Sequence, residues 1–487
     1  MKKEDLFYKI ADIDDDYILK AGEYSVNKKH GRNRRLIMAA SAAVLIIAVI
    51  AVSIISRGKI SGPTDGYPFG VTKVLAAYPA PVAEGMSAER FGQSDEFMEW
   101  NTESEQKASR SKSLQTGING YYTSVMQEIL GSGDDNAVCS PLNMYIALAM
   151  LAEVTDGNSR TQILDMLGVS DIDALREQVQ CLWESNYVDI PIAKSIPANS
   201  LWLSDTESYN TDTLQRLAEQ YYASTFSGTP GSKEMNEALR TWMNKNTFGL
   251  LSEYIKDITI DPEAVLEIVS TLYYKAVWNA PFSPDKTTTE TFHGTKGDTS
   301  AEMMHQTMIN GYAYGTDTYT AVKLWLSGGG SMCFYLPDEG VNVETLILGP
   351  DILAPVTGDI RTDKNWFPSM IHLSLPKFKI SKKLDMIDML EKYGVTDVLS
   401  DVTSDFTPLS DNPRLYLSAA GHAAVLEVDE EGVTGAAYTI ISVNNTSMPS
   451  NEIDLVFDRP FMFVLAGKDG SVLFSGVVRN TGLMKTD

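Results

Sequence analysis

The chain is poor in the residues that build disulfide frameworks, metal sites and basic binding surfaces. Its 487 residues include three cysteines and five histidines, and Cys139, Cys181 and Cys333 are widely spaced. Such isolated cysteines give no disulfide framework and no metal-ligand spacing, so neither a metal nor a cofactor is expected. Against 64 Asp and Glu there are 40 Lys and Arg, for a formal net charge of -24. This acidity argues against nucleic acid and heparin-like polysaccharides as partners.

The motifs of common enzyme classes are also missing. The sequence has no GxSxG elbow, no HExxH helix and no phosphate-loop lysine. We therefore expect no catalytic residue in this chain, and we predict that the protein is not an enzyme.

One long hydrophobic run interrupts the acidic sequence. Residues 36–56 are apolar and uncharged over about twenty positions, enough to span a bilayer as a helix. Five basic residues lie between Lys28 and Arg35. This flank predicts a single-pass anchor in the cell membrane, with residues 1–35 in the cytoplasm and the rest extracellular. A cleavable signal peptide is the rival interpretation, although the run is long for one.

The remainder divides into a linker and a folded body. Residues 57–113 are rich in Gly, Pro, Ser and Ala, which favours an extracellular linker, and the body follows at 114–484. Helical spacing appears at 114–130, 141–152, 160–167, 212–222, 234–246 and 384–393. Strand-like runs appear at 264–275, 320–326, 331–336, 371–380, 415–428, 454–457, 461–466 and 472–478. Helices first and strands later are typical of an α+β domain.

The stretch from Glu431 to Arg459 combines features of a buried strand with features of a loop. No charge occurs from Gly432 to Asn451, and the one proline there is Pro449. Central strands exclude charge and proline, yet acidic and Pro-rich flanks set this stretch apart as they would a loop. The pattern favours a segment that occupies both states. A plain sheet strand with polar ends is the alternative.

Ten strings in the body share their order and spacing with one known family. They are NAVCSPLNMYIALAMLAEVTDGNSRTQIL (136–164), ANSLWL (198–203), WMNKNTFGLL (242–251), VSTLYYKAVWNAPF (269–282), EMMHQ (302–306), SMCFYLPDEG (331–340), LSLPKFKI (373–380), EVDEEGVTGAAYT (427–439), DRPFMFVL (458–465) and LFSGVV (473–478). Through them the body resembles the serpins. The resemblance implies a metastable α+β fold with three β-sheets, eight or nine helices and an exposed reactive loop at about 430–456.

In that family the loop is bait for a serine or cysteine protease. The protease forms an acyl-enzyme with the loop, and the cleaved loop inserts into the central sheet as a new strand. The protease is carried along and distorted before it can deacylate. A stretch without charges, with its proline near one end, agrees with such an insertion.

The resemblance also places the attacked bond. Counting seventeen residues from the hinge glutamate, Glu430, gives Thr446–Ser447, and Pro449, which could not join a central strand, falls beyond the cut. The stretch has no lysine or arginine before Arg459, so elastase-like or subtilisin-like proteases are expected rather than trypsin-like ones. Alternative cut sites are Val443, Asn445 and Met448.

The hinge departs from the strict family pattern. Val433 replaces a threonine of similar shape, Gly435 adds flexibility, and Tyr438 is bulky in a run usually made of alanines. None of these is a proline or a charge that would block insertion. The hinge residues are Glu430, Glu431, Gly432, Val433, Thr434, Gly435, Ala436 and Ala437.

A polar gate is implied where the sheet must part. Family members often have two serines, an asparagine and a histidine there. Here Asn143 stands for one serine and Ser270 for the asparagine, a reciprocal swap that keeps one amide and one hydroxyl. A solvent-pointing Asn143 is the simpler alternative. The matching gate residues are Ser140, Asn143, Ser270 and His422, with Trp278 beneath the entry point of the loop.

Two functions follow from the resemblance. The first is a monomeric, membrane-tethered suicide inhibitor of a bacterial type, which forms a covalent acyl complex with a target serine protease. The second is a non-inhibitory serpin that serves as a binding or scaffold module on the cell surface.

Overall fold

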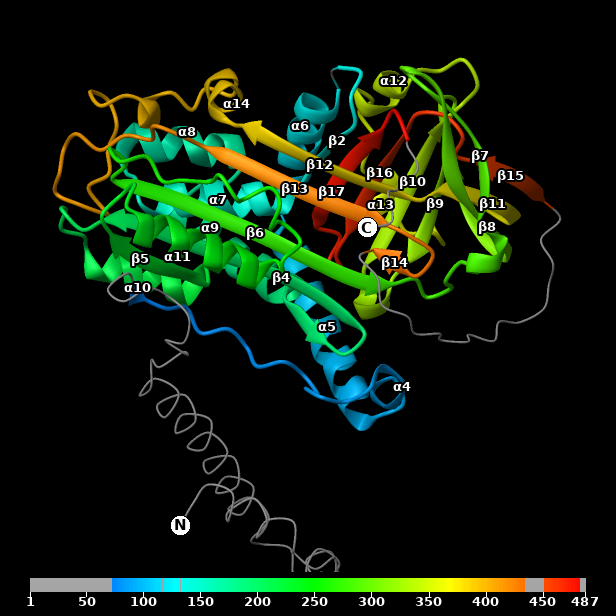
Figure 1. The fold of residues 1–487 in the computed structure, drawn as a ribbon, viewed down its shortest axis with the longest axis horizontal. Coiled ribbons are helices and arrows are strands. Elements are labelled where there is room, and N and C mark those ends of the chain that lie inside the picture. The colour runs from blue at the N-terminus through cyan, green and yellow to red at the C-terminus, as the bar shows by residue number, and fades with distance from the viewer. Residues whose placement is uncertain (1–71, 116, 132, 434–450, 482–487) are drawn as a thin grey trace, which may run out of the picture. The chain divides into compact units, whose positions relative to one another are not determined.

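The structure, a computed structural model, describes residues 72–115, 117–131, 133–433 and 451–481. Within them helices dominate the first half and strands the second, which confirms the predicted α+β class (Figure 1). None of the helices described is long and apolar enough to cross a membrane, and the predicted span at 36–56 lies outside these residues. The α-helices are α4 (Ala88–Phe91), α5 (Asp95–Leu114), α6 (Ile118–Leu130), α7 (Pro141–Glu153), α8 (Gly157–Leu167), α9 (Ile172–Asn186), α10 (Thr211–Gln220), α11 (Lys233–Asn246), α12 (Val343–Ile347), α13 (Ala354–Thr357) and α14 (Ile387–Lys392).

The first sheet is the one that contains the hinge. Helices α7 and α11 pack on opposite faces of this sheet. In its strand β6 (Leu266–Val277), Ser270 contacts α7, whereas the adjacent residue Val269 packs with α11. Its order is β1 (Thr72–Val74), β5 (Ala223–Gly228), β4 (Ala193–Ser204), β6 (Leu266–Val277), β14 (Gly432–Val433), β13 (Gly421–Val428) and β12 (Phe378–Asp385), with β3 (Val188–Ile190) beside β4.

The second sheet joins what the resemblance implied would be two separate sheets. The long strand β8 pairs with β11 over most of its length and then, at Ala313–Gly315, with β9. One continuous strand therefore links both parts, and the described residues form two hydrogen-bonded sheets rather than three. The order is β15 (Glu452–Val456), β11 (Trp366–Pro376), β8 (Gly297–Gly315), β9 (Tyr319–Trp325), β10 (Ser331–Pro337), β16 (Phe461–Ala466), β17 (Val472–Val478) and β2 (Ala137–Cys139), with β7 (Thr288–Gly294) beside β8.

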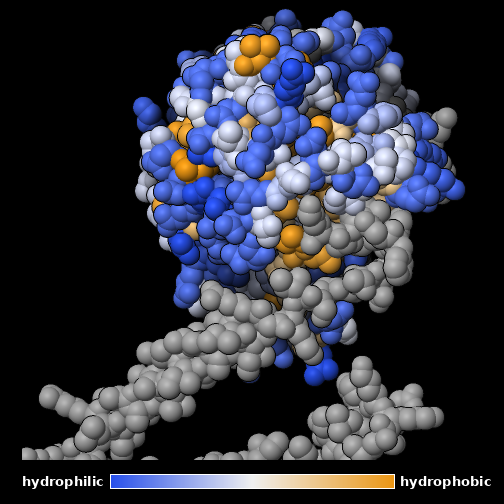
Figure 2. Space-filling model, turned by 90° about the vertical axis from the view of Figure 1, so that its left-hand side faces the viewer, coloured by the Kyte–Doolittle hydropathy of each residue, from blue (hydrophilic) through white to orange (hydrophobic). Residues whose placement is uncertain are grey.

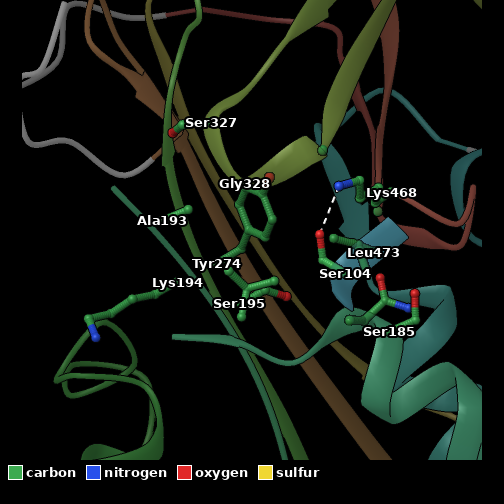
Figure 3. A pocket seen from close by; sticks show the side chains of 14 residues that line it. Ser104, Ser185, Ala193, Lys194, Ser195, Tyr274, Ser327, Gly328, Lys468 and Leu473 are labelled. Atoms are coloured by element: carbon green, nitrogen blue, oxygen red, sulfur yellow. Dashed lines mark hydrogen bonds between the residues drawn. The ribbon is translucent and has the colours of Figure 1, made fainter. Parts of the chain in front are cut away.

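The predicted linker differs from the structure over residues 72–113. Strand β1 extends the first sheet beside β5, and α5 packs on α9 and on the β16–β17 turn. Lys468 in that turn donates to Ser104 of α5, beside a small cavity (Figure 3), and forms an ion pair with Glu105 at 3.0 Å. Composition did not reveal this helix because polar contacts hold it: of its twenty residues, Ala108 and Ser111 are buried.

Asp469 in the same turn is the buried acceptor that fixes α5. Its carboxylate accepts from Ser111 at 2.6 Å, from Gln115 at 3.1 Å and from Asn186 of α9 at 3.1 Å. This one side chain, 2% exposed, therefore joins α5, α9 and the turn.

The outer surface of the folded body is mostly hydrophilic in the view of Figure 2, with small scattered hydrophobic spots. The apolar side chains are instead gathered in the interior between the sheets and helices.

We expect Asp469→Asn to lower the free energy of unfolding by about 2–3 kcal/mol, because an amide cannot accept from all of these donors and leaves buried groups unpaired. Urea unfolding followed by circular dichroism measures the change. Asp165→Asn, the same change at an exposed position, is the control. Equal midpoints for the two variants would contradict this role of Asp469.

Candidate functional site

A gap between two strands of the first sheet is the candidate site. Strand β14 lies between β6 and β13 at one end only, where Gly432 is opposite Val277 and Val433 is opposite both Ala276 and Val428. Farther along, no described strand pairs with the facing edges of β6 and β13 (Figure 1). A cavity of about 250 Å³ lies between them, walled by both strands, β12 and the region of α11.

The hinge begins with a tight turn anchored on its own acid. The carboxylate of Asp429 accepts from the backbone N–H groups of Glu431 (2.9 Å) and Gly432 (3.0 Å). Glu430 is held by Lys377 at 3.2 Å and by the Thr287 hydroxyl at 2.8 Å. Although burial opposes it, these partners hold the pKa of Glu430 below its usual value, so it remains a carboxylate.

Trp278 lies beneath this turn. Its backbone N–H donates to the Glu431 carbonyl at 2.9 Å, and its indole N–H donates to the Asp429 carbonyl at 3.0 Å. The side chain is almost fully buried. Trp278 therefore holds the turn at Asp429 and Glu431, and it is not part of the polar cluster farther down the gap.

Gly432 is required where the hinge enters the sheet. A Cβ atom at this position would lie 2.1 Å from the carbonyl oxygen of Ala276 on β6. No side chain fits at that distance, so only glycine lets β14 pair with β6 here.

Helix α7 carries two of the four gate residues and runs beneath the gap. It begins with Pro141 at its first position, directly after Ser140 in an extended conformation. All its residues except Ala147 are buried. The helix therefore presents Ser140 and Asn143 from a fixed platform to the strands above it.

The structure brings the four predicted gate residues together. The backbone N–H of Ser140 donates to His422 Nε2 at 3.0 Å, and the Ser140 hydroxyl donates to the Leu473 carbonyl at 2.5 Å. The Asn143 amide donates to the Ser270 carbonyl at 3.1 Å, and the Ser270 hydroxyl contacts the Asn143 Oδ1. Asn143 is 4% exposed, so the alternative of a solvent-pointing side chain is wrong.

His422 is the uncharged member of the gate. Burial lowers its pKa to about 4, and its Nε2 accepts a hydrogen bond, so near neutral pH the ring is neutral with its proton on Nδ1. A neutral ring avoids placing a charge between β13 and α7.

Asn199 on β4 completes the cluster and was missed from the sequence. It is fully buried and lies opposite Ser270 in the strand register, with its Oδ1 2.6 Å from the Ser270 hydroxyl. Its amide donates to the Tyr221 carbonyl at 2.9 Å. The sequence signal for Asn199 was its polar side chain within ANSLWL, a string that is otherwise typical of a buried strand.

The other predicted site residues lie outside the described residues. These are the later hinge residues Thr434, Gly435, Ala436 and Ala437, the bond Thr446–Ser447, and the alternative cut sites Val443, Asn445 and Met448. The described chain stops at Val433 in the first sheet and resumes at Asn451, beside β15 at the edge of the second.

We expect Gly432→Ala to expel β14 from the sheet, because its Cβ would overlap Ala276. The amides of Trp278 and Phe282, which donate to the turn, should then exchange with deuterium faster, and stability should fall by about 1–3 kcal/mol. Gly421→Ala on β13 is the matched control, since a Cβ atom there would have no other heavy atom pressing on it within 4 Å. Unchanged exchange in Gly432→Ala would contradict the close approach.

The direct contact of Asn143 with Ser270 predicts that the swap is compensatory. We expect Asn143→Ser to lower the unfolding free energy by about 1–3 kcal/mol, because the Ser270 carbonyl and hydroxyl lose a partner. Adding Ser270→Asn should restore at least half of that loss. Urea unfolding of the two single variants and the double variant measures the coupling, and strictly additive losses would refute it.

Comparisons with known proteins agree with this geometry. Residues 118–481 match the family described as "Serpin (serine protease inhibitor)". Serpin A3-8 of Bos taurus is 28% identical over 373 residues, covering 73% of this chain and 85% of the relative. Alpha-1-antiproteinase 2 of Equus caballus is 29% identical over 360 residues, covering 71% and 82%.

Solved structures share the fold. Tengpin, a thermophilic serpin in its native state, is 24% identical, with a TM-score of 0.65 over 75% of this chain and 94% of that one. The Arabidopsis serpin AtSerpin1 in its native stressed conformation is also 24% identical, with a TM-score of 0.63 over 76% and 98%. The matched region contains the gap, the described part of the hinge and the gate, and the chain belongs to the serpin family.

Proposed function

We propose that this chain is a suicide inhibitor of serine or cysteine endopeptidases and traps its target by inserting the cleaved loop into the gap of the first sheet. The observation that carries the proposal is β14, which already enters between β6 and β13 while the rest of the gap has no described strand in it. Two facing strand edges whose backbone groups have no strand partner among the described residues favour a further strand.

The register of β14 supports the fit of the loop to this gap. Continued along both neighbours, it would set Thr439 opposite Ser270 on β6 and His422 on β13, at the level of the gate. Glycine, alanine, threonine and aliphatic residues would then face α7, and Tyr438 would face the side of α11. The loop brings no charge into the sheet, so no charged group of the loop has to be desolvated on insertion.

The residues of the loop also support the target class. A trypsin-like protease needs a basic residue to anchor in its pocket, and the stretch between Glu431 and Arg459 has none. Small and β-branched residues around Thr446 suit the shallow apolar pockets of elastase-like or subtilisin-like enzymes. We place the bond at Thr446–Ser447, with Val443, Asn445 and Met448 as alternatives.

The location of the inhibitor rests on the sequence. The apolar run at 36–56 and its basic N-terminal flank support a single-pass anchor that leaves the serpin domain outside the cell. A tethered inhibitor in that place would protect the surface of its own cell from secreted proteases. The alternative, a non-inhibitory binding or scaffold module, shares this location.

The full-length chain, solubilised in a mild detergent, should trap an elastase-like protease or a subtilisin. We expect a protease-sized upward shift on a denaturing gel and a released peptide that begins at Ser447. Ala437→Arg, which would bring a charge to the core side of the sheet, should convert the inhibitor into a cleaved substrate. Cleavage without a covalent band in the unmodified chain, across a panel of such proteases, would favour the binding-module alternative.

A further inference from the structure

One carboxylate lies in the otherwise largely uncharged gap. Glu267 is on β6, near the end farthest from the hinge, and lines the cavity between β6 and β13. The register of β14 sets it level with Ala419, just before β13 begins. On its other side β6 pairs with β4, where Trp202 is opposite Glu267. Among the described residues, Glu267 has no hydrogen-bond donor to its side chain and no ion pair.

The groups around Glu267 do not compensate its charge. Helix α11 and the segment after it present Leu239, Met243, Leu251 and Ile258 to the cavity, all apolar. Asp261 in that segment adds a like charge nearby. From the opposite wall, Lys383 of β12 and the neutral His422 of β13 line the cavity, but neither forms an ion pair with Glu267 within the described chain.

A strand placed in the gap would isolate Glu267 further. Neighbouring strands lie about 4.8 Å apart, so a strand between β6 and β13 would leave Lys383 three strand positions from Glu267. Glu267 is now only partly buried, and such a strand would remove its side chain further from solvent. A carboxylate that loses water without gaining a partner becomes more costly in its charged form.

We propose that filling the gap is coupled to protonation of Glu267, so that the carboxyl group acts as a proton-controlled latch on strand insertion. This inference rests on the proposed insertion mechanism and adds a regulator to it. One proton moves from solvent to the Glu267 carboxylate as the strand closes over it, and no covalent bond changes.

The direction of the pH dependence follows from the pKa of Glu267 while the gap is open. Burial, aided by Asp261, raises the pKa of Glu267 to about 7 before insertion. Insertion raises it further, so the filled state binds more protons and is favoured as the pH falls through 7. A further rise of one pKa unit makes insertion about eightfold more favourable at pH 6 than at pH 9. His422, with a pKa of about 4, stays neutral throughout that range.

Proton uptake on insertion tests the latch without requiring a target. The loop of the full-length chain is nicked with a protease that it does not trap, at pH 8, and protons are counted with an indicator dye. For a rise of one to two pKa units, the unmodified chain should take up about 0.4–0.8 proton more than Glu267→Gln, because protons released by peptide hydrolysis are common to both. Glu267→Leu, a second neutral variant, should match Glu267→Gln.

The fate of the acyl complex gives a second readout. At each pH, the ratio of trapped to cleaved inhibitor is measured for the unmodified chain and divided by the same ratio for Glu267→Gln. This normalised ratio should rise severalfold when the pH is lowered from 8.5 to 6.5. Glu263→Gln, the same change at an exposed site four residues away, should behave like the unmodified chain.

The outcomes separate the two proposals. Equal proton uptake and equal pH profiles in the unmodified chain and Glu267→Gln, with covalent complexes present, would overturn the latch and leave inhibition standing. A nicked chain that gains no thermal stability at any pH does not insert its loop, and this would overturn the insertion mechanism together with the latch.

Discussion

The edges of β6 and β13, which beyond β14 have no strand partner within the described part of the chain, are the constraint on which the rest of this structure depends. Backbone N–H and C=O groups need partners when water is scarce, and here helices cover both faces of the sheet where the two strands face each other. Strand β14 supplies partners over only two residues. Over the residues that the structure describes, the gap is therefore open beyond β14, and the gate and the hinge turn are the contacts that border it in this state.

The gate shows how such a state can be stable. Ser140 and Asn143 are fixed on α7, whereas Ser270 lies on β6 and His422 on β13. One helix thus bonds both edges of the gap from below, and Asn199 extends the network to β4. Polar pairs in an apolar interior are costly to break one at a time. If a strand entered the gap, the polar groups of this network would be able to exchange their present hydrogen bonds for new ones to that strand. A purely apolar contact between the two edges would offer no such hydrogen bonds.

Local sequence strings predicted much of the fold and the site, but they did not predict which distant segments of the chain pair. The order of helical and strand-like runs predicted the α+β class, and the family strings led to the contact between Asn143 and Ser270, because both residues lie inside them. The joining of β8 to β9 depends on three residue pairs at the end of a long strand, which no local pattern encodes. Helix α5 lies within the predicted linker, because its docking depends on Asp469, more than 350 residues away in the sequence. The scissile bond lies beyond the described residues, so its position stays a prediction.

The position of Glu267 also bears on which strands the open gap could accept. An exposed pair of strand edges is a template for any extended segment, including a segment from another molecule, and a charge directed into such an edge discourages pairing. A carboxylate near the far end of the gap does not affect the first steps of insertion beside β14. Its desolvation costs free energy only when the inserted strand is long enough to reach it. A long intramolecular loop that is already anchored at Gly432 can meet that cost, because its first contacts form without one. A free segment from another chain, with no such anchor, would meet the charge before it had gained comparable pairing.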